Sequence, residues 1–543
     1  MSQNSIFGLN SGFDTAQVVD QLIELQSRPI DINLAKREDQ VTRLTTFQDL
    51  KSRLQSFRTT LNTLNKDTRF ISTKGVFTPT GSTTTQIVDI STTSTASSGT
   101  FTLEVTQLAR EAKISTAGYE SITSTVPTGT LELIVGGKTT LINIDSTNNT
   151  LDGLRLAINN SGAEVQANLI NDGNGSTPFR LSISALQTGS ANTLSARIFG
   201  GAIGVGEFDL LNFTETQSPQ DALLKLDGID ITKSSNVISD VIPGATLTLN
   251  GTGTGQIKLS TDLTAIRDKV NDFISGYNSL IQFIQEQSSF DPETLETGLL
   301  FGNFAVSNLQ NLLRSTVSGK VTGITGEFEF LSQVGVTTQS DGTLVLETDA
   351  LNEALTQNVG NVAELFSSRG TVDNVNVTFI GFTDKTQAGT YEIRVFNGQP
   401  QIRKQGETEF VDAPGSGNFF AGPEGHDSEG LNFRLANLAD GDYGTITVSI
   451  GVAETLNRQI DFLTDSTQNG PLTSEINTIT KTIDDLDETL FKLDERLKEF
   501  ERNIRERFTN LEIILGRLNT QRESFASSIA NIQGIFGAQK KNG

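Results

Sequence analysis

Few side chains in this sequence could carry out catalysis. The chain of 543 residues contains no cysteine and one histidine, His426. Without cysteine there is no disulfide framework, thiolate zinc site, iron–sulfur cluster or cysteine nucleophile. A single histidine cannot supply the two or three imidazoles of a histidine zinc site. His426 follows Gly425 in a loop, where we expect a solvated side chain, so most enzyme chemistry is excluded.

Two glycine-containing motifs resemble ligand-binding loops but lack a necessary residue. A phosphate-binding loop needs a glycine five positions before Gly137, and Glu132 stands there. The β-branched runs on either side of Gly137 predict a hairpin turn instead. The stretch 171–176 lacks the bidentate glutamate that ends a calcium loop, so an Asx-type turn is favoured.

The remaining candidates also lack the required context. The glycine-rich stretch 251–255 is followed by no helix before Leu263 and does not match the dinucleotide-binding pattern. The acidic pairs Asp484-Asp485 and Asp487-Glu488 belong to a heptad repeat and are expected on its solvated faces. We therefore predict a protein that is not an enzyme and that has no cofactor or metal site.

The charge balance limits the partners. The 41 basic and 64 acidic side chains leave a net charge of −23, which repels phosphate backbones and anionic lipid headgroups. No apolar run reaches the length of a membrane span. Residues 1–8 have neither the basic nor the apolar region of a secretory signal. We expect no nucleic-acid or membrane partner, and either a cytoplasmic protein or export by an unconventional route.

The N-terminal end has a helical pattern. Asp14 is suited to cap a helix over 15–25, and Arg28-Pro29 is expected to interrupt that helix because proline lacks an N–H. A second helix follows, with an apolar seam that steps by three and four residues. The seam residues are Phe47, Leu50, Leu54, Phe57, Leu61 and Leu64.

The middle of the chain has a different texture. Alternating apolar runs separated by turn residues predict strands over 71–260 and again over 371–452. A short helix is expected within the first of these regions, at 151–158. Further amphipathic helices are expected at 262–288, 303–317 and 349–366.

The C-terminal end carries the strongest heptad pattern. Its a and d positions are Ile476, Ile479, Ile483, Leu486, Leu490, Leu493, Leu497, Phe500 and Ile504. Arg507 and Gln521 interrupt the continuation of this seam. At about 2 kcal/mol for each buried side chain, the seam must be covered by another helix. That helix belongs either to an intramolecular hairpin with 47–64 or 263–284, or to an intermolecular bundle, and both arrangements are possible along different parts.

The chain ends also carry a more specific motif. Its residues are Gly8, Leu9, Ser11, Gly12, Phe13 and Asp14, followed by Leu22 and Pro29. This opening resembles that of the flagellar filament-capping proteins, the flagellar hook-associated protein 2 family. Segments 98–109 and 150–183 are similar to the first head strands of that family and to the module that it shares with flagellins. The C-terminal coiled coil at 473–530 is similar as well.

The resemblance implies an α+β multidomain fold. Both chain ends form a coiled-coil or helical-bundle leg, and β-rich head domains are inserted between them. The expected domains are a terminal helical domain (1–45 with 505–543), a helical leg (46–70 with 261–370 and 453–504), a β-rich head (71–125 with 205–260), a second β-rich head with the flagellin-like module (126–204), and an additional β-rich insertion (371–452).

The resemblance also implies a function. It implies a bacterial protein that is secreted through the flagellar export channel and forms a ring of about five copies at the filament tip. The ring would confine exported flagellin and promote its folding and insertion. Hook–filament junction proteins and a flagellar export chaperone are the other implied partners. The N-terminal motif and the C-terminal seam are the implied assembly and oligomerisation residues.

Two other functions remain open at this stage. A flagellar junction or filament protein would share the helical ends, although the Gly-Phe-Asp opening and the early β module argue against it. An adhesin whose exposed head binds glycans would suit the threonine-rich strands. The chain has no tryptophan and four tyrosines, however, so an aromatic sugar platform is not evident.

The imperfect seams generate a first testable prediction. We expect 1–45 and 505–543 to be largely disordered in the free subunit, because Arg28-Pro29, Arg507 and Gln521 weaken their packing. Hydrogen exchange of the monomer should then show fast exchange in both segments and protection in 46–70. Strong protection of both ends in the monomer would contradict the prediction.

Overall fold

We describe a computed structural model of the chain. It describes residues 15–80, 85–199, 211–324 and 326–539, with side chains up to residue 530. The chain divides into two compact units. The first comprises Met1–Asn65, Asn271–Ala354 and Gly360–Gly543, and the second comprises Lys66–Val270 with Leu355–Val359. Helices at both ends and antiparallel sheets between them confirm the predicted α+β class.

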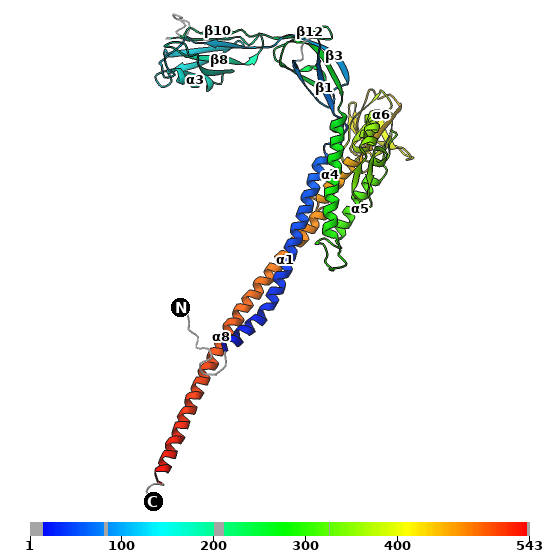
Figure 1. Cartoon of the computed structure of the whole chain (residues 1–543). Helices are drawn as coiled ribbons and strands as arrows, with labels where there is room; N and C mark the ends of the chain where they lie inside the picture. Colours follow the sequence, from blue (N-terminus) through cyan, green and yellow to red (C-terminus); the bar gives the residue numbers. More distant parts are fainter. Residues whose placement is uncertain (1–14, 81–84, 200–210, 325, 540–543) are drawn as a thin grey trace. The chain divides into compact units, whose positions relative to one another are not determined.

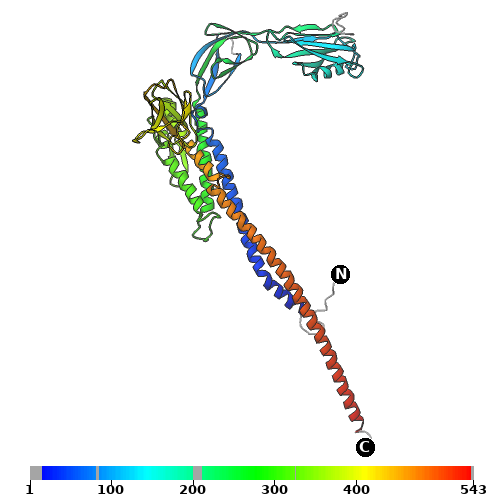
Figure 2. The same cartoon turned by 180° about the vertical axis from the view of Figure 1, so that it is seen from behind.

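The first unit is built on helices. Its two longest, α1 (Thr15–Leu61) and α8 (Pro471–Gln539), lie side by side, as Figure 1 and the reverse view in Figure 2 show. Helices α5 and α7 and the larger parts of α4 and α6 complete the helical part, with a 3₁₀ turn and a two-stranded sheet. Their bounds are α4 (Leu263–Ser288), α5 (Phe304–Ser318), η1 (Leu331–Val334), β16 (Val336–Thr338), β17 (Leu344–Leu346), α6 (Thr348–Phe366) and α7 (Val452–Thr464).

An aromatic cluster holds α1 against α4. The ring of Phe273 lies 5.8 Å from that of Phe57 and 5.8 Å from that of Phe366, measured between centroids. A Cβ on Gly276 would lie 2.8 Å from Cδ2 of Phe57, so glycine lets the two helices approach this closely. Tyr277 is fully buried beside them, and burial raises the pKa of its hydroxyl to about 12.

The β-rich insertion of the first unit contains two packed sheets. Their strand orders are β18-β26-β20-β21-β22 and β19-β25-β24-β23. The core between them includes Tyr391, Ile402 and Phe433, which are 2% exposed or less. The bounds are β18 (Ser368–Val372), β19 (Val377–Gly381), β20 (Gly389–Phe396), β21 (Gln399–Lys404), β22 (Val411–Asp412), β23 (Gly415–Ser416), β24 (Phe419–Ala421), β25 (Asn432–Leu435) and β26 (Gly441–Ile450).

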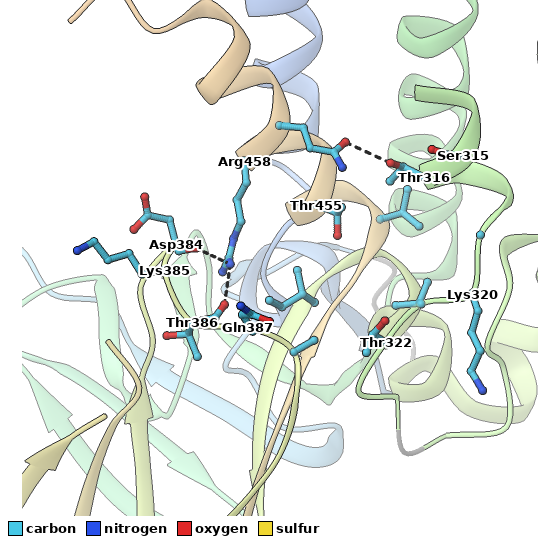
Figure 3. A pocket seen from close by; sticks show the side chains of 16 residues that line it. Ser315, Thr316, Lys320, Thr322, Asp384, Lys385, Thr386, Gln387, Thr455 and Arg458 are labelled. Atoms are coloured by element: carbon cyan, nitrogen blue, oxygen red, sulfur yellow. Dashed lines mark hydrogen bonds between the residues drawn. The ribbon is translucent and has the colours of Figure 1, made fainter. Parts of the chain in front are cut away.

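Arg458 of α7 fastens the insertion to the helices. Its Nη1 donates to the backbone oxygens of Asp384 at 2.7 Å and Thr386 at 2.8 Å, as Figure 3 shows. Its Nε donates to Glu454 at 2.8 Å, one turn earlier on the same helix. Five donors in a planar fork allow one arginine to hold both the loop and its own helix. The insertion is therefore anchored through backbone atoms of its 384–386 loop.

The second unit contains two β-rich cores. The first core lies among β1-β15-β3-β11-β12 and β13-β14-β2 and includes Leu103, Leu247 and Ile257. The bounds are α2 (Asp67–Phe70), β1 (Thr73–Pro79), β2 (Val88–Thr92), β3 (Gly99–Gln107), β11 (Ala222–Leu226), β12 (Ile229–Lys233), β13 (Val237–Ile242), β14 (Ala245–Leu249) and β15 (Gly253–Thr261).

The second core of this unit surrounds a short helix, α3 (Leu151–Asn159). The Thr150 hydroxyl accepts a hydrogen bond from the Gly153 N–H and caps the helix, which confirms the predicted helix at 151–158. The sheets have the orders β10-β4-β8-β7 and β6-β5-β9. The bounds are β4 (Glu111–Ser115), β5 (Gly129–Val135), β6 (Lys138–Ile144), β7 (Val165–Asn171), β8 (Phe179–Thr188), β9 (Leu194–Phe199) and β10 (Thr214–Gln217).

One prediction about local structure is wrong. Helix α1 runs without interruption from Thr15 to Leu61 and includes Pro29, where the sequence predicted a break. Proline has no N–H to donate to the Leu25 carbonyl, so the helix loses one intrahelical hydrogen bond at this position. The lengthwise contact with α8 supports the helix on both sides of it.

The aromatic cluster generates a second prediction. Replacing the fully buried Phe273 with alanine should destabilise the helical unit by about 3–5 kcal/mol, because a large cavity replaces the ring. The matched control is Phe462→Ala on α7, where the ring is 66% exposed and the expected loss is below about 0.5 kcal/mol. Denaturant unfolding followed by far-ultraviolet circular dichroism measures both. Equal losses in the two variants would contradict the assignment of Phe273 to the core.

Candidate assembly surface on the paired chain ends

The pairing of α1 with α8 is antiparallel. Thr15 Oγ1 donates to Glu512 Oε1 at 3.3 Å at one end, and Lys51 Nζ donates to Thr473 Oγ1 at 3.1 Å at the other. Between them Arg37 forms a two-point ion pair with Asp487, in which Nη2 lies 3.2 Å from Oδ2. The Arg37 pKa is raised, chiefly by its hydrogen bond to Asp487. The two helices therefore run in opposite directions along their contact.

The predicted heptad seam of α8 lies on the side that faces α1. Ile479 and Ile483 are 4% and 8% exposed. The other seven predicted seam residues are half-buried, and none is fully exposed: Ile476, Leu486, Leu490, Leu493, Leu497, Phe500 and Ile504. Helices α1 and α8 therefore bury the seam only in part. Each of these seven side chains keeps some contact with solvent.

The opposing face of α1 changes character along its length. From Phe47 to Leu61 it is apolar, and Phe47, Leu50, Leu54 and Leu61 are fully buried. Around residues 37–40 the positions that face α8 are polar, and Arg37 and Gln40 occupy two of them, whereas Val19, nearer the N-terminus, is again fully buried. The half of the seam around Leu490 thus meets polar groups, and this explains why it is only partly covered.

Helix α8 extends beyond Glu512, which contacts Thr15 at the start of α1, and its apolar positions on both sides of Glu512 are exposed. Leu511, Ile514 and Leu518 are 44%, 52% and 54% exposed in the described part of the chain. Arg507, which interrupts the seam, is also exposed. An apolar stripe of this kind is typical of a helix that packs against something outside its own subunit.

Most of the predicted N-terminal motif lies outside the described residues. This applies to Gly8, Leu9, Ser11, Gly12, Phe13 and the predicted cap Asp14. Leu22 is half-buried on α1 and Pro29 is exposed on the same helix. The role of the motif in assembly stays a prediction.

The prediction for His426 is wrong. Its side chain is 14% exposed, with Nε2 3.0 Å from Glu407 Oε2 and Nδ1 2.7 Å from the hydroxyl of Ser428. The pKa of Glu407 is lowered, chiefly because its carboxylate accepts the Lys404 N–H. Although serine, histidine and glutamate meet here, Ser428 is fully buried, so no substrate could reach its oxygen. The arrangement ties the 407 and 426 loops together.

A cavity of about 440 Å³ lies beside Arg458 between α5, α7 and the insertion (Figure 3). Its cations are already paired: Lys320 with Glu329, Lys385 with Glu429 and Arg458 with Glu454. Each of these three cations is therefore neutralised by a carboxylate of the same chain. Across the described ranges there is also no cluster of three potential metal ligands.

The two loops that resembled ligand sites have structural roles. Asp172 accepts from the Arg180 guanidinium at 2.6 Å, and this hydrogen bond lowers the pKa of its carboxyl. Gly137 lies in the turn between β5 and β6, as the sequence predicted. No helix in the described part of the chain is long and apolar enough to span a membrane.

Antiparallel end helices with a partly covered seam, joined to β-rich domains, define a class of structural proteins that assemble through their chain ends. Two family models match this chain: the flagellar hook-associated protein 2 N-terminus over residues 11–112, and the C-terminus over residues 219–520. The chain belongs to the flagellar hook-associated protein 2 family.

Individual relatives agree with this assignment. Flagellar hook-associated protein 2 of Escherichia coli strain K12 is 30% identical over 399 residues, which cover 70% of this chain and 83% of that protein. B-type flagellar hook-associated protein 2 of Pseudomonas aeruginosa is 29% identical over 382 residues, covering 65% and 78%. The solved D1-D2-D3 domains of the Escherichia coli flagellar cap protein are similar with 29% identity and a TM-score of 0.48, over 59% of this chain and 89% of that one.

Three predictions made from the sequence are confirmed by these comparisons. The first is the family resemblance itself, and the second is the function as a structural cap of the flagellar filament. The predicted extracellular location at the filament tip is confirmed as well.

The partly covered seam generates a third prediction. Replacing Leu490 with asparagine should weaken the α1–α8 pairing by about 1–3 kcal/mol, because a polar amide replaces a half-buried apolar group. The adjacent Phe491 is 68% exposed, so Phe491→Asn should change stability by less than about 0.5 kcal/mol. Denaturant unfolding followed by far-ultraviolet circular dichroism measures the stability of both variants. Equal losses in the two variants would show that the seam does not hold α1.

Proposed function

We propose that this protein forms a homo-oligomeric ring of about five copies at the distal tip of the filament. The ring confines exported flagellin subunits and promotes their folding and insertion into the growing filament. The work is steric confinement and needs no catalysis by the cap. The single observation that carries the proposal is the α8 seam, whose apolar residues are only partly covered within one subunit.

The division of labour follows the predicted domains. We infer that 1–45 with 505–543 form a terminal helical domain, and that 46–70, 261–370 and 453–504 form the leg. Two heads, predicted at 71–125 with 205–260 and at 126–204, would form a plate, and 371–452 would add a β-rich insertion beside the leg. Strands β4 and β10 fall within the predicted first head but pack in the core of the second. Under this arrangement the legs engage the filament while the heads meet one another.

The change from apolar to polar contacts along α1 supports an assembly surface whose contacts can rearrange. The apolar stretch around Leu50 and Leu54 holds α1 firmly, whereas the stretch around Arg37 pairs through a half-exposed ion pair. Exposed ion pairs contribute about 0–1 kcal/mol and exchange easily. The N-terminal motif from Gly8 to Asp14 and the seam from Ile476 to Ile504 are therefore proposed as assembly elements that form new contacts in the ring.

The composition supports export as an unfolded chain. A chain without cysteine needs no oxidation before or after passage. An export chaperone would cover the terminal helices before passage, and hook–filament junction proteins would receive the first ring. We infer that 1–45 and 505–543 stay largely disordered until such a partner binds.

Removing the protein tests the function. A strain that lacks this chain should secrete flagellin that does not polymerise, because nothing retains subunits at the tip. Electron microscopy of the cells and immunoblotting of the medium measure the two quantities, and expression of the full chain is the control. Filaments of normal number and length in the deletion strain would refute the cap and favour a junction protein or an adhesin.

A further inference from the structure

The β-rich insertion repeats the sheet topology of the first head, the sandwich made of β1–β3 and β11–β15. Counted within each sandwich, the first strand pairs with the last, the last with the third, and the third with the fourth. The two orders are β1-β15-β3-β11-β12 and β18-β26-β20-β21-β22. In the opposing sheets, β2 pairs with β14 and β19 with β25, which in both cases is the strand before the last. The last strand leads into a helix, α4 or α7.

Individual positions correspond as well. In both sandwiches an aliphatic residue of the last strand lies between two glycines of the neighbouring strands. These rows are Gly75, Leu259 and Gly99 in the first head, and Gly370, Val448 and Gly389 in the insertion. A Cβ on Gly75 would lie 2.2 Å from Cγ2 of Ile90, and one on Gly370 would lie 2.4 Å from Cε2 of Phe379. Each glycine therefore makes room for a side chain of the opposing sheet, and the two sandwiches follow one pattern.

An asparagine stands at the same position at one end of both sandwiches. Asn236 directly precedes β13, and Asn418 directly precedes β24. The Asn236 backbone carbonyl accepts the Leu249 N–H at 2.8 Å, and the Asn418 backbone carbonyl accepts the Leu435 N–H at 3.0 Å. Each of these leucines ends the neighbouring strand, β14 or β25. The two asparagines are therefore equivalent, and their surroundings can be compared directly.

The side chains of the two asparagines differ in their partners. The Asn236 side-chain carbonyl accepts the Ala109 N–H at 2.7 Å, and its amide donates to the Ala109 carbonyl at 2.9 Å. Ala109 lies in the connection that leaves β3 for β4. One asparagine thus binds both backbone groups of a passing residue, a contact that reads the backbone and not the side chain. The Asn418 side chain is exposed and forms no hydrogen bond within the part of the chain that the structure describes.

The second head covers this end of the first head. Ser190 donates to Asp221 through its N–H at 2.8 Å and through its hydroxyl at 2.5 Å. The Thr188 hydroxyl donates to the carbonyl of Ser234, two residues before Asn236, at 2.5 Å. The end of the sandwich that carries Asn236 is therefore in contact with further protein.

The insertion has no counterpart of the β3–β4 connection. Its third strand, β20, is joined to β21 by a turn at Asn397 and Gly398, with φ of 53° and 72°. Asp440 accepts both N–H groups of that turn, at 3.0 Å and 2.7 Å, and so fixes it. The chain of the insertion therefore does not continue past Asn418 in the way that the β3–β4 connection continues past Asn236.

The same end of the insertion exposes apolar side chains. Val375, Phe396, Phe419 and Leu438 are 96%, 53%, 58% and 37% exposed. Their turns are adjacent, because the Ala436 N–H donates to the Asn376 carbonyl at 2.8 Å and Asp440 accepts from Asn397. We call this surface, with Asn418, the open end. It combines apolar groups with one unpaired amide, which is the chemistry of a protein-binding site.

We propose that the open end binds an extended segment of another protein, in the way that the first head binds its own β3–β4 connection. Asn418 binds the N–H and the C=O of one residue of that segment, and Phe396 and Phe419 cover apolar side chains next to it. The partner is selected for an extended backbone with apolar side chains. This contact goes beyond the proposed cap and does not depend on the ring.

Because the chain contains no cysteine, disulfide trapping can test this site without background. The probe is a synthetic peptide with the sequence of residues 104–112, which includes Ala109, with a cysteine added at one end. The control peptide is identical but carries an N-methyl group at the alanine that corresponds to Ala109, so it lacks the N–H that the asparagine accepts. The full-length variant Ser416→Cys supplies the thiol, because Ser416 lies opposite Phe419 in the β23–β24 pair.

At redox equilibrium, the Ser416→Cys protein should trap the probe about three- to tenfold more than the N-methyl peptide, as expected for one hydrogen bond. Adding Asn418→Ala should bring that ratio to about one. Adding Asn308→Ala instead should leave the ratio unchanged, because Asn308 is exposed on α5. Mass spectrometry measures the trapped fraction, and circular dichroism checks that each variant is folded. Equal trapping of the two peptides, or a ratio that survives Asn418→Ala, would overturn the proposal.

The test is independent of the cap because it uses the isolated chain. Trapping that follows this pattern in a protein that proves dispensable for filament growth would keep the open end and refute the cap. A further variant, Phe396→Ser with Phe419→Ser, should abolish trapping without changing the association of copies in light scattering. Weaker association with unchanged trapping would assign the open end to a contact between copies and would also overturn the proposal.

Discussion

The antiparallel contact between α1 and α8 is the constraint on which the rest of the helical unit depends. It brings Thr15 to Glu512 and Lys51 to Thr473, so it closes a loop that contains nearly the whole chain. The entropic cost of closing a loop rises only slowly with the length of the loop. Burial of the many apolar side chains of the seam offsets that cost. Everything between the two helices is an insertion into this hairpin, and it can vary without changing how the ends meet.

The packing of α1 changes along its length. Its closed apolar part stabilises the subunit, and its partly covered part is available for assembly. Near Phe57, α1 packs against α4 in a closed aromatic core, where Gly276 permits close approach. Around Arg37 and Gln40, polar residues of α1 face the apolar seam of α8, and the seam is covered only in part. A surface that a single subunit cannot cover is what an oligomer requires.

Local periodicity predicted much of this fold. The helices at 151–158 and 262–288 and the strands of both β-rich regions were recognisable because each side chain's face repeats every 3.6 or 2 residues. The uninterrupted helix through Pro29 could not be predicted in this way, because its support comes from the distant helix α8. The environment of His426 could not be predicted either, because its partner Glu407 lies in another loop. Nor could the hydrogen bonds from Arg458 to the backbone of the 384–386 loop.

By itself the sequence determined that the ends are heptad helices, that cysteine-based and multi-histidine chemistry is absent, and to which family the chain belongs. These properties depend on residue types and on short spacings along the chain, which can be read without the tertiary structure. Only the tertiary structure decided that α1 rather than α4 covers the seam of α8, and that it does so incompletely. The physical reason is that burial depends on which distant segment supplies the opposing face, and Arg37 and Gln40 supply a polar one.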